Sequence, residues 1–295
     1  MTSVAVIAHR NKTLGGGLAE LRTVLAEKGV SDPLWYEVPK SSKAPKFARQ
    51  AVADGADLLF IWGGDGTVQQ CVNAVAGKAV DLAILPAGTA NLLANNLEIP
   101  IDLRGAVEVG LNGDRRILDV GVLNGERFAV MAGVGFDAIM MRDADGELKS
   151  HLGRLAYVWT GVRATHMTSR KVRIELDGEP WFKGKASCVL LGQMGNLASG
   201  IVAFPDARPD DGLLEIGVVT AENALQWARV LSRLVVEDAK HSPLAQMGQG
   251  RQIDIKLDRP TTYELDGGAR TAKKRFRATI EPGAITIRVP QKEKS

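Results

Sequence analysis

Hydrophobic and polar residues follow different patterns in the two parts of the chain. Up to about residue 110, short uninterrupted apolar runs alternate with segments whose apolar residues recur every three or four positions. The runs Val4–Ala8, Leu58–Trp62 and Leu82–Leu85 show no alternation, which is typical of strands buried on both faces of a parallel sheet. The segment Val68–Ala76 places its apolar residues on one helical face. This succession of strands and helices predicts right-handed crossovers and an open parallel sheet.

Beyond Asp119 the pattern changes to short strand candidates separated by turns. Asn-Gly or Asp-Gly pairs at 124–125, 177–178 and 266–267 favour antiparallel hairpins. Helices are expected at about 149–165 and 224–236. The strand candidates are Val120–Leu123, Phe128–Met131, Lys171–Leu176, Ala186–Leu191, Leu213–Val219, Arg251–Leu257, Thr261–Leu265 and Ile285–Val289.

This organisation predicts an α/β N-terminal domain with an open parallel sheet at 1–118. A β-rich antiparallel C-terminal domain follows at 119–290, with a polar tail at 291–295. The 295 residues suffice for two domains, and 45% hydrophobic with 24% charged residues excludes intrinsic disorder.

Charge and cysteine content restrict the partners and the compartment. The net charge of +3 gives no global argument for nucleic acid, so no nucleic-acid partner is expected. Cys71 and Cys188 lack the spacing of a disulfide framework or a zinc site, which fits the cytoplasm. The first ten residues do not resemble a signal peptide, and no apolar run reaches the roughly 18 residues of a membrane span.

The first candidate site is the loop Gly63-Gly64-Asp65-Gly66-Thr67, which follows a buried strand and opens a helix. Open α/β sheets bind ligands at this edge, and glycines let backbone N–H groups approach an anion. Thr67 is expected to cap the helix. Asp65 suits Mg²⁺ or a water network beside a phosphate. The alternative is an ordinary strand–helix turn in which Asp65 forms an Asx turn.

A second loop, Pro86-Ala87-Gly88-Thr89-Ala90-Asn91, follows the next strand and opens the helix Leu92–Leu97. Consecutive βα loops of this kind are expected to lie side by side and line one nucleotide site. The absence of GxxxxGK[ST] and GxGxxG motifs excludes a Walker or classical Rossmann site.

These motifs resemble the diacylglycerol kinase catalytic family, which includes bacterial lipid kinases and sphingosine kinases. The resemblance rests on GGDGTVQQCVNAVAG at 63–77 and LAILPAGTANLLANNLEIP at 82–100. It continues through VMAGVGFDA at 130–138, LKSHLGRLAYVWTGVR at 148–163 and FPDARPDDGLL at 204–214. The segment 262–289, with Asp266-Gly267 and Glu281-Pro282-Gly283, resembles the family's closing strands. The order of the motifs implies the family's NAD kinase-like two-domain fold.

The resemblance also implies roles for individual residues. The substrate ATP and the cofactor Mg²⁺ would be bound through Gly63, Gly64, Asp65, Gly66, Thr67, Gly88, Thr89 and Asn91, with Asp65 organising the metal. Asp266 would be the general base, although as part of an Asp-Gly pair it can equally be a hairpin-turn residue. A structural metal would be held at Arg208, Asp211 and Leu213.

The expected function is transfer of the γ-phosphoryl group to a lipid hydroxyl, with diacylglycerol as the first choice. Gly268 departs from the Glu that many family members have there. This departure keeps a non-catalytic nucleotide- or lipid-binding regulator open, beside an NAD kinase-like enzyme with a non-lipid substrate. The expected partners are the lipid, a membrane surface contacted peripherally from the cytoplasm, and a second copy of the chain. A basic cluster at Arg270, Lys273, Lys274, Arg275 and Arg277, and the aromatic pair Trp181 and Phe182, are candidates for that membrane contact.

Overall fold

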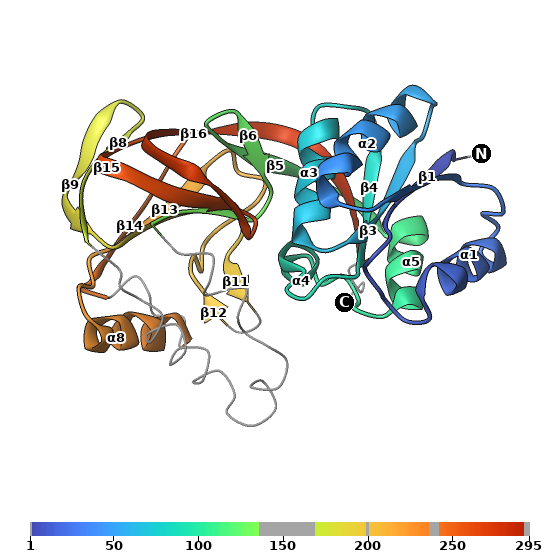
Figure 1. Cartoon of the computed structure of the whole chain (residues 1–295), viewed down its shortest axis with the longest axis horizontal. Coiled ribbons are helices and arrows are strands. Elements are labelled where there is room, and N and C mark those ends of the chain that lie inside the picture. The colour runs from blue at the N-terminus through green and yellow to red at the C-terminus, as the bar shows by residue number, and fades with distance from the viewer. Residues whose placement is uncertain (1, 136–168, 199–200, 236–241, 292–295) are drawn as a thin grey trace. The chain divides into compact units, whose positions relative to one another are not determined.

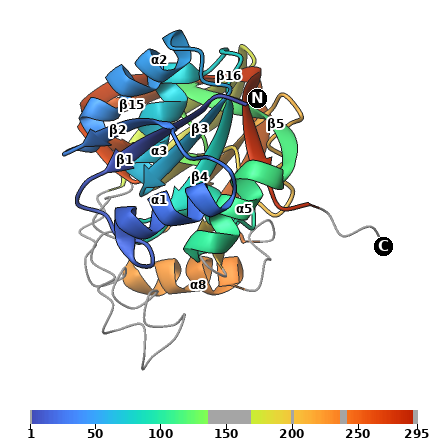
Figure 2. The same ribbon diagram turned by 90° about the vertical axis from the view of Figure 1, so that its right-hand side faces the viewer.

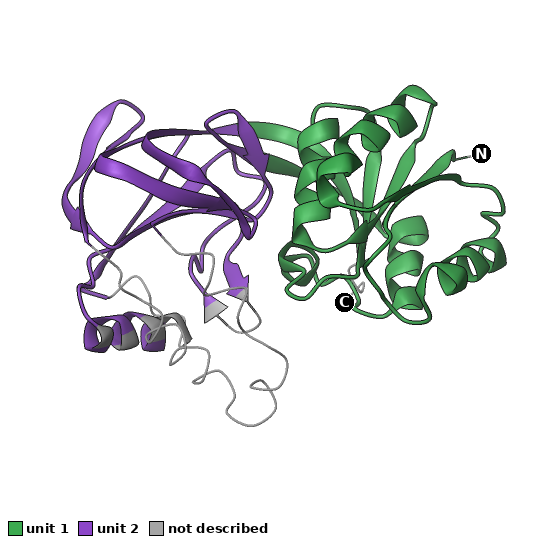
Figure 3. Cartoon of the chain, viewed as in Figure 1, with its two compact units in different colours: residues 1–120, 281–295 green, residues 121–280 purple. Residues whose placement is uncertain are grey.

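The computed structural model describes residues 2–135, 169–198, 201–235 and 242–291, and the chain forms two compact units (Figure 3). The first unit combines Met1–Val120 with Glu281–Ser295, and the second is Gly121–Ile280. The predicted division kept residues 119–290 together, whereas the segment from Glu281 onward lies here in the first unit.

The first unit is built on a sheet with the strand order β16-β4-β3-β1-β2, in which all neighbouring strands pair in parallel. Its elements are β1 (Val4–His9), α1 (Gly17–Glu27), β2 (Leu34–Val38), the 3₁₀ helix η1 (Ser41–Lys43), α2 (Ala44–Ala53), β3 (Leu58–Gly63), α3 (Asp65–Val75), β4 (Asp81–Pro86), α4 (Leu92–Asn96), α5 (Leu103–Asn112), the start of β5 (Asp114–Leu123) and the end of β16 (Gly268–Val289).

The buried strands of this unit are covered on both sides by helices. Helices α2 and α3 pack together on one face, and α1 and α5 on the other (Figure 2). Every residue of β3 and β4 is buried, as the uninterrupted apolar runs predict. Helix α5, which the sequence reading did not identify, begins where the Asp102 carboxylate accepts the Gly105 N–H at 2.8 Å.

The second unit is an antiparallel sheet with the order β14-β13-β10-β7-β15-β16. The hairpin β8–β9 adds to this sheet through β15 (Figure 1). Its other elements are the end of β5, β6 (Glu126–Phe128), β7 (Met131–Val134), β8 (Arg170–Leu176), β9 (Glu179–Ala186), β10 (Cys188–Gly192), β11 (Asn196–Ala198), β12 (Ile201–Val202), β13 (Leu214–Val219), α8 (Ala224–Val235), β14 (Ala245–Gly250) and β15 (Gln252–Leu265).

Two hydrophobic clusters stabilise the second unit. The larger one fills one face of the sheet and includes Val172, Ile174, Ile255 and Phe276. The smaller one packs Trp227 and Val230 of α8 with residues such as Phe204 and Cys188. Because buried and exposed residues alternate along β8, each strand presents one face to the core and one to solvent.

The structure confirms the predicted fold class: a parallel α/β unit followed by an antiparallel β-rich unit. The two strands predicted at 251–257 and 261–265 form the single strand β15, whose register shifts between Lys256 and Thr261. The helix predicted at 224–236 is α8, and the one at about 149–165 lies outside the described residues. In the described ranges, no helix is long and apolar enough to cross a membrane.

Candidate functional site

The two glycine-rich loops meet at the carboxyl edge of the parallel strands. Strands β3 and β4 pair in register up to Gly63 and Pro86, so both loops begin at the same level. A Cβ atom added at Gly88 would lie 2.4 Å from the Cα of Gly64, a distance that no real side chain tolerates. Glycine is therefore required for the backbones to approach, and the predicted side-by-side placement of the loops is confirmed.

The Asp65 carboxylate connects these loops. Its Oδ1 accepts the N–H of Leu92 at 2.5 Å, and its Oδ2 accepts the N–H of Asn91 at 3.0 Å. Asn91 lies in the left-handed region with φ of 49°, which turns its N–H toward Asp65. The first residue of α3 thus fixes the start of α4. Each carboxylate oxygen has more than one lone pair and can accept a further hydrogen bond.

Burial dominates the electrostatics of Asp65. Partial removal from water raises the pKa of its carboxyl group, because the charged form loses solvation. The N–H donors of Leu92 and Asn91 and the positive charge of Lys12 oppose this shift without cancelling it. The folded chain therefore binds a proton on Asp65 more tightly than an ordinary aspartate does.

Asn91 maintains the shape of the second loop. Its Oδ1 accepts the N–H of Gly88 at 2.8 Å, and its Nδ2 donates to the carbonyls of Pro86 and Gly88 at 3.2 and 3.0 Å. Its amide is thus engaged inside the loop, so its predicted contact with a nucleotide would have to compete with these bonds. Thr89, in contrast, is exposed at the loop tip.

Thr67 does not cap α3, contrary to the sequence-based expectation. The helix begins at Asp65, with Gly64 preceding it, so Thr67 already lies within the first turn. Its side chain is buried, and its Oγ1 lies 2.9 Å from the Oγ of Ser41 in η1. This hydroxyl pair connects the segment after β2 to the loop after β3.

Ser41 and Lys12 are site residues that the sequence reading missed. The Lys12 carbonyl accepts the indole N–H of Trp62 at 3.0 Å, so the segment after β1 lies beside the end of β3. Their position could have been predicted, because Lys12 follows β1 and Ser41 follows β2. Both strands belong to the same parallel sheet, so their carboxyl ends reach the edge where the glycine-rich loops lie.

Asp266 lies in a tight turn of the second unit and is almost fully buried, with 4% of its surface exposed. Asp266 and Gly267 both have positive φ, 44° and 78°, as a two-residue type I′ hairpin requires. The Asp266 carboxylate accepts three backbone N–H groups of a distant segment at 2.8 to 2.9 Å. They belong to Ala129, Val130 and Met131.

The other two Gly-containing hairpin turns use the same arrangement. The Asp177 Oδ1 accepts the N–H groups of Arg251 and Gln252, and the Asn124 Oδ1 accepts that of Arg277. Both residues also have positive φ. The turn interpretation of Asp266 therefore describes its backbone and its contacts, while its role as a general base stays a prediction.

The segment of the predicted structural metal forms a local turn. Asp211 and Arg208 are exposed, and the Asp211 Oδ1 accepts the N–H of Leu213 at 3.0 Å. Burial and, secondarily, the charge of Asp211 raise the pKa of Glu215. No group of three or more His, Cys, Asp or Glu residues suited to a metal occurs among the described residues. The predicted site would use one carboxylate together with main-chain carbonyls, and it stays a prediction.

Two family models match the chain. The diacylglycerol kinase catalytic domain matches residues 6–123, and the YegS C-terminal NAD kinase beta sandwich-like domain matches residues 130–289. A diacylglycerol kinase of Staphylococcus carnosus is 30% identical over 247 residues, 83% of this chain and 80% of that protein. An uncharacterised Synechocystis protein is 30% identical over 253 residues, 82% of this chain, and the chain spans 56% of its length.

Solved structures show the same fold. A diacylglycerol kinase from Bacillus anthracis gives a TM-score of 0.79 at 24% identity, covering 97% of this chain and 96% of that chain. An NAD kinase from Archaeoglobus fulgidus in complex with ATP gives 0.53 at 11% identity, covering 97% and 93%. The family models match both units, and the S. carnosus kinase is similar over most of the chain. The chain therefore belongs to the diacylglycerol kinase catalytic family, a family of lipid kinases.

Proposed function

We propose that this chain is an ATP- and Mg²⁺-dependent lipid kinase that transfers the γ-phosphoryl group to a hydroxyl of diacylglycerol. The observation that carries the proposal is the pair of glycine-rich loops at one sheet edge, joined through Asp65. Family membership supports the lipid acceptor, and the ATP-bound NAD kinase of similar fold supports the nucleotide.

The loops offer the groups that a triphosphate needs. Gly64 is half-buried and Gly66 is exposed, and the 11-residue helix α3 begins beside them, so its N-terminus favours negative charge. Positioning and neutralisation of the phosphates are most of what phosphoryl transfer requires of a protein. Lys12 contributes a positive charge from the neighbouring segment. Thr89 contributes an exposed hydroxyl.

Magnesium fits this edge only together with the nucleotide. Asp65 supplies one carboxylate whose oxygens already accept N–H groups, and the described residues hold no group of three metal-binding side chains. Mg²⁺ commonly uses one or two carboxylates and completes its shell with phosphate oxygens and water. When bound, it would neutralise charge on the phosphates. Asp65 would then orient a metal-bound water while holding the two loops in place.

Asp266 is the proposed acceptor of the lipid hydroxyl proton. Its Oδ1 accepts the N–H groups of Val130 and Met131 and its Oδ2 accepts that of Ala129, and these bonds hold the carboxylate in one orientation. Directly after this turn, Gly268 leaves room for Arg270, whose Nη1 would lie 2.8 Å from an added Cβ. The Arg270 guanidinium pairs with Glu126 at 2.7 Å, so its positive charge is engaged by another carboxylate.

The test is transfer of labelled phosphate from ATP to diacylglycerol in neutral detergent micelles, with and without Mg²⁺. We expect phosphatidic acid only when ATP, Mg²⁺ and diacylglycerol are all present. Transfer to NAD instead would favour the NAD kinase-like alternative. Nucleotide binding without transfer to any acceptor would favour the regulator.

The variant Asp65→Ala tests whether phosphoryl transfer depends on the two glycine-rich loops. It removes the acceptor of two N–H groups and displaces the loops, and a misplacement of about 1 Å can cost about 10²-fold in rate. Asp57→Ala is the matched control, because the Asp57 carboxylate accepts the Ser3 N–H at 2.9 Å just before β3 begins, at the opposite sheet edge. If Asp65→Ala turned over at the parent rate, the arrangement of the two loops would not be needed for transfer, which would contradict the proposal.

A further inference from the structure

A row of positive charges crosses four adjacent strands of the second unit. The register pairs Lys183 of β9 with Arg173 of β8, Arg173 with Lys256 of β15, and Lys256 with Arg275 of β16. Directly opposite residues in neighbouring strands project from the same face of a sheet. These four cations, separated by up to 102 positions in the sequence, therefore form one continuous row.

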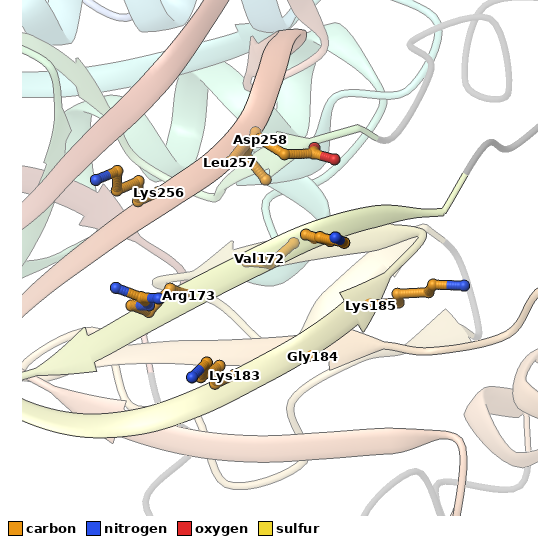
Figure 4. Close-up of a pocket in the computed structure, with 9 residues that line it drawn as sticks. Val172, Arg173, Lys183, Gly184, Lys185, Lys256, Leu257 and Asp258 are labelled. Atoms are coloured by element: carbon orange, nitrogen blue, oxygen red, sulfur yellow. The ribbon is translucent and has the colours of Figure 1, made fainter.

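Two further cations extend this row into a face. Lys171 and Lys185 are also paired across β8 and β9. Together these residues form the basic face: Lys171, Arg173, Lys183, Lys185, Lys256 and Arg275. All six are exposed, whereas Val172, between Lys171 and Arg173, and Leu257, next to Lys256, are buried. A shallow groove of about 460 Å³ runs between Lys256, Arg173 and Lys183, with Asp258 as its acidic member (Figure 4).

This arrangement is unfavourable for the isolated fold. Like charges directly opposite each other destabilise a sheet, and three such pairs involve Arg173 or Lys256. No ion pair joins any of the six to an acidic group in the described ranges. Arg277 and Arg270, which belong to the cluster recognised in the sequence, pair instead with Asp254 and Glu126 at 2.7 Å.

Protection of a sheet edge explains only part of the basic face. Lysines on edge strands prevent pairing with other chains, and β9 pairs only with β8 among the described strands. Arg173 and Lys256 lie on strands that have partners on both sides. Edge protection therefore does not account for the positive charges of Arg173 and Lys256, whereas binding of an external anion would.

We propose that the basic face is a docking surface for an anionic lipid bilayer. The inference rests on the proposed function, because a diacylglycerol substrate resides in a membrane. Each Lys or Arg close to an anionic bilayer contributes to binding independently of any specific pocket. Trp181 and Phe182 are partly buried against the core of the unit, which limits their use as apolar anchors. Binding is therefore electrostatic and decreases steeply with salt.

The experiment measures binding of the full chain to vesicles of phosphatidylcholine with and without phosphatidylglycerol, at low and high salt. We expect binding only to the anionic vesicles and its loss at high salt. The variant Lys183→Gln/Lys185→Gln should weaken binding about twenty-five-fold, from about fivefold per cation. Adding Arg173→Gln should bring the loss to about a hundredfold, with a melting temperature no lower than that of the parent.

The matched control removes the same charge elsewhere. Arg49 and Lys78 are exposed residues of the first unit without ion pairs among those described, and Arg49→Gln/Lys78→Gln should bind vesicles like the parent. Equal losses in both double variants would show that only net charge matters and would overturn the proposal. Tighter binding of the parent to a duplex oligonucleotide than to anionic vesicles at the same salt would also overturn it.

Activity in neutral micelles separates this proposal from the proposed function. The basic-face variants should phosphorylate diacylglycerol normally in neutral micelles and poorly on anionic vesicles. If no protein phosphorylates lipid but the vesicle results hold, the proposed function fails and the docking surface stands. If micelle activity is present while the variants bind vesicles like the parent, the docking surface fails alone.

Discussion

Asp65 and Asp266 use the same chemistry in two differently built regions. Each carboxylate accepts backbone N–H groups from a distant segment, two for Asp65 and three for Asp266. Asp65 is partly exposed, between loops that end in accessible glycines and the exposed Thr89, whereas Asp266 is buried inside a hairpin. A carboxylate in a motif can therefore serve the fold and the reaction together, and the extent of burial determines how strongly the fold depends on it.

The largest effect is expected at Asp266. Asp266→Ala leaves three buried N–H groups without their acceptor, at about 1–3 kcal/mol each, and should destabilise the chain by several kcal/mol. Asp266→Asn keeps the Oδ1 contacts but places an amide donor opposite the Ala129 N–H, so it should cost about 1–3 kcal/mol. Denaturant unfolding measures both.

Asp177→Asn is the control for the turn itself, because Asp177 occupies an equivalent but exposed hairpin. It should cost less than about 1 kcal/mol. If Asp266→Asn is as stable as the parent yet turns over about 10²-fold more slowly, the general-base role outweighs the structural one. If it is less stable and its folded fraction retains full activity, the base lies elsewhere.

A smaller effect is expected where the two glycine-rich loops touch. Gly88→Ala would place its Cβ 2.4 Å from Gly64 and 2.6 Å from the Asn91 Oδ1, which should cost about 1–3 kcal/mol and weaken nucleotide binding. Gly66→Ala has open space, because its Cβ would lie 3.8 Å from the Ser41 Oγ, and it should stabilise the helix by about 0.5–1 kcal/mol. Calorimetry of both variants, with and without ATP, tests this. Unchanged stability of Gly88→Ala would show that the loops separate readily.

The pH dependence of Asp65 gives a subtler comparison. Its pKa is raised by burial above the usual 3.8, so the folded chain holds the proton more tightly than the unfolded chain. Its contribution to stability is therefore present at low pH and is lost as the pH rises through the folded-state pKa. The difference in unfolding free energy between the parent and Asp65→Asn should decline across this interval, just above the ordinary aspartate range. A difference that increases there would reverse the assigned sign.

The smallest expected effect is a change in the labelling rates of the two buried thiols, one in each unit. Burial raises the pKa of Cys71 in α3 to about 12, and it also raises that of Cys188 in β10. Neither thiol should react with iodoacetamide at neutral pH until its surroundings open. Asp65→Ala should accelerate labelling of Cys71, and Asp266→Ala that of Cys188, as mass spectrometry of the peptides would show. Equal acceleration of both would mean that the units open together.

The features that could be predicted from the sequence are those with a regular pattern of apolar residues. The buried strands β3 and β4 and the loops after them follow from uninterrupted apolar runs that end in glycine, and family motifs supplied the fold of both units. Strand β9, Glu179–Ala186, was missed because lysines, a proline and a glycine obscure its alternation. The bond from Asp65 to Asn91 depends on a positive φ at Asn91 that no local pattern reveals. The basic face arises only from strand register, because its members are scattered from Lys171 to Arg275.

The position of strand β16 determines the order in which the two units can be completed during synthesis. Its residues up to Ile280 belong to the second unit, and its end pairs with β4 through Thr286 and Ile287 of the first. There Arg288 reaches Asp81, which also receives a bidentate contact from Arg115. A ribosome releases this strand only after the entire second unit has emerged. Until then β4 lacks its outer neighbour, so the first unit is synthesised first and completed last.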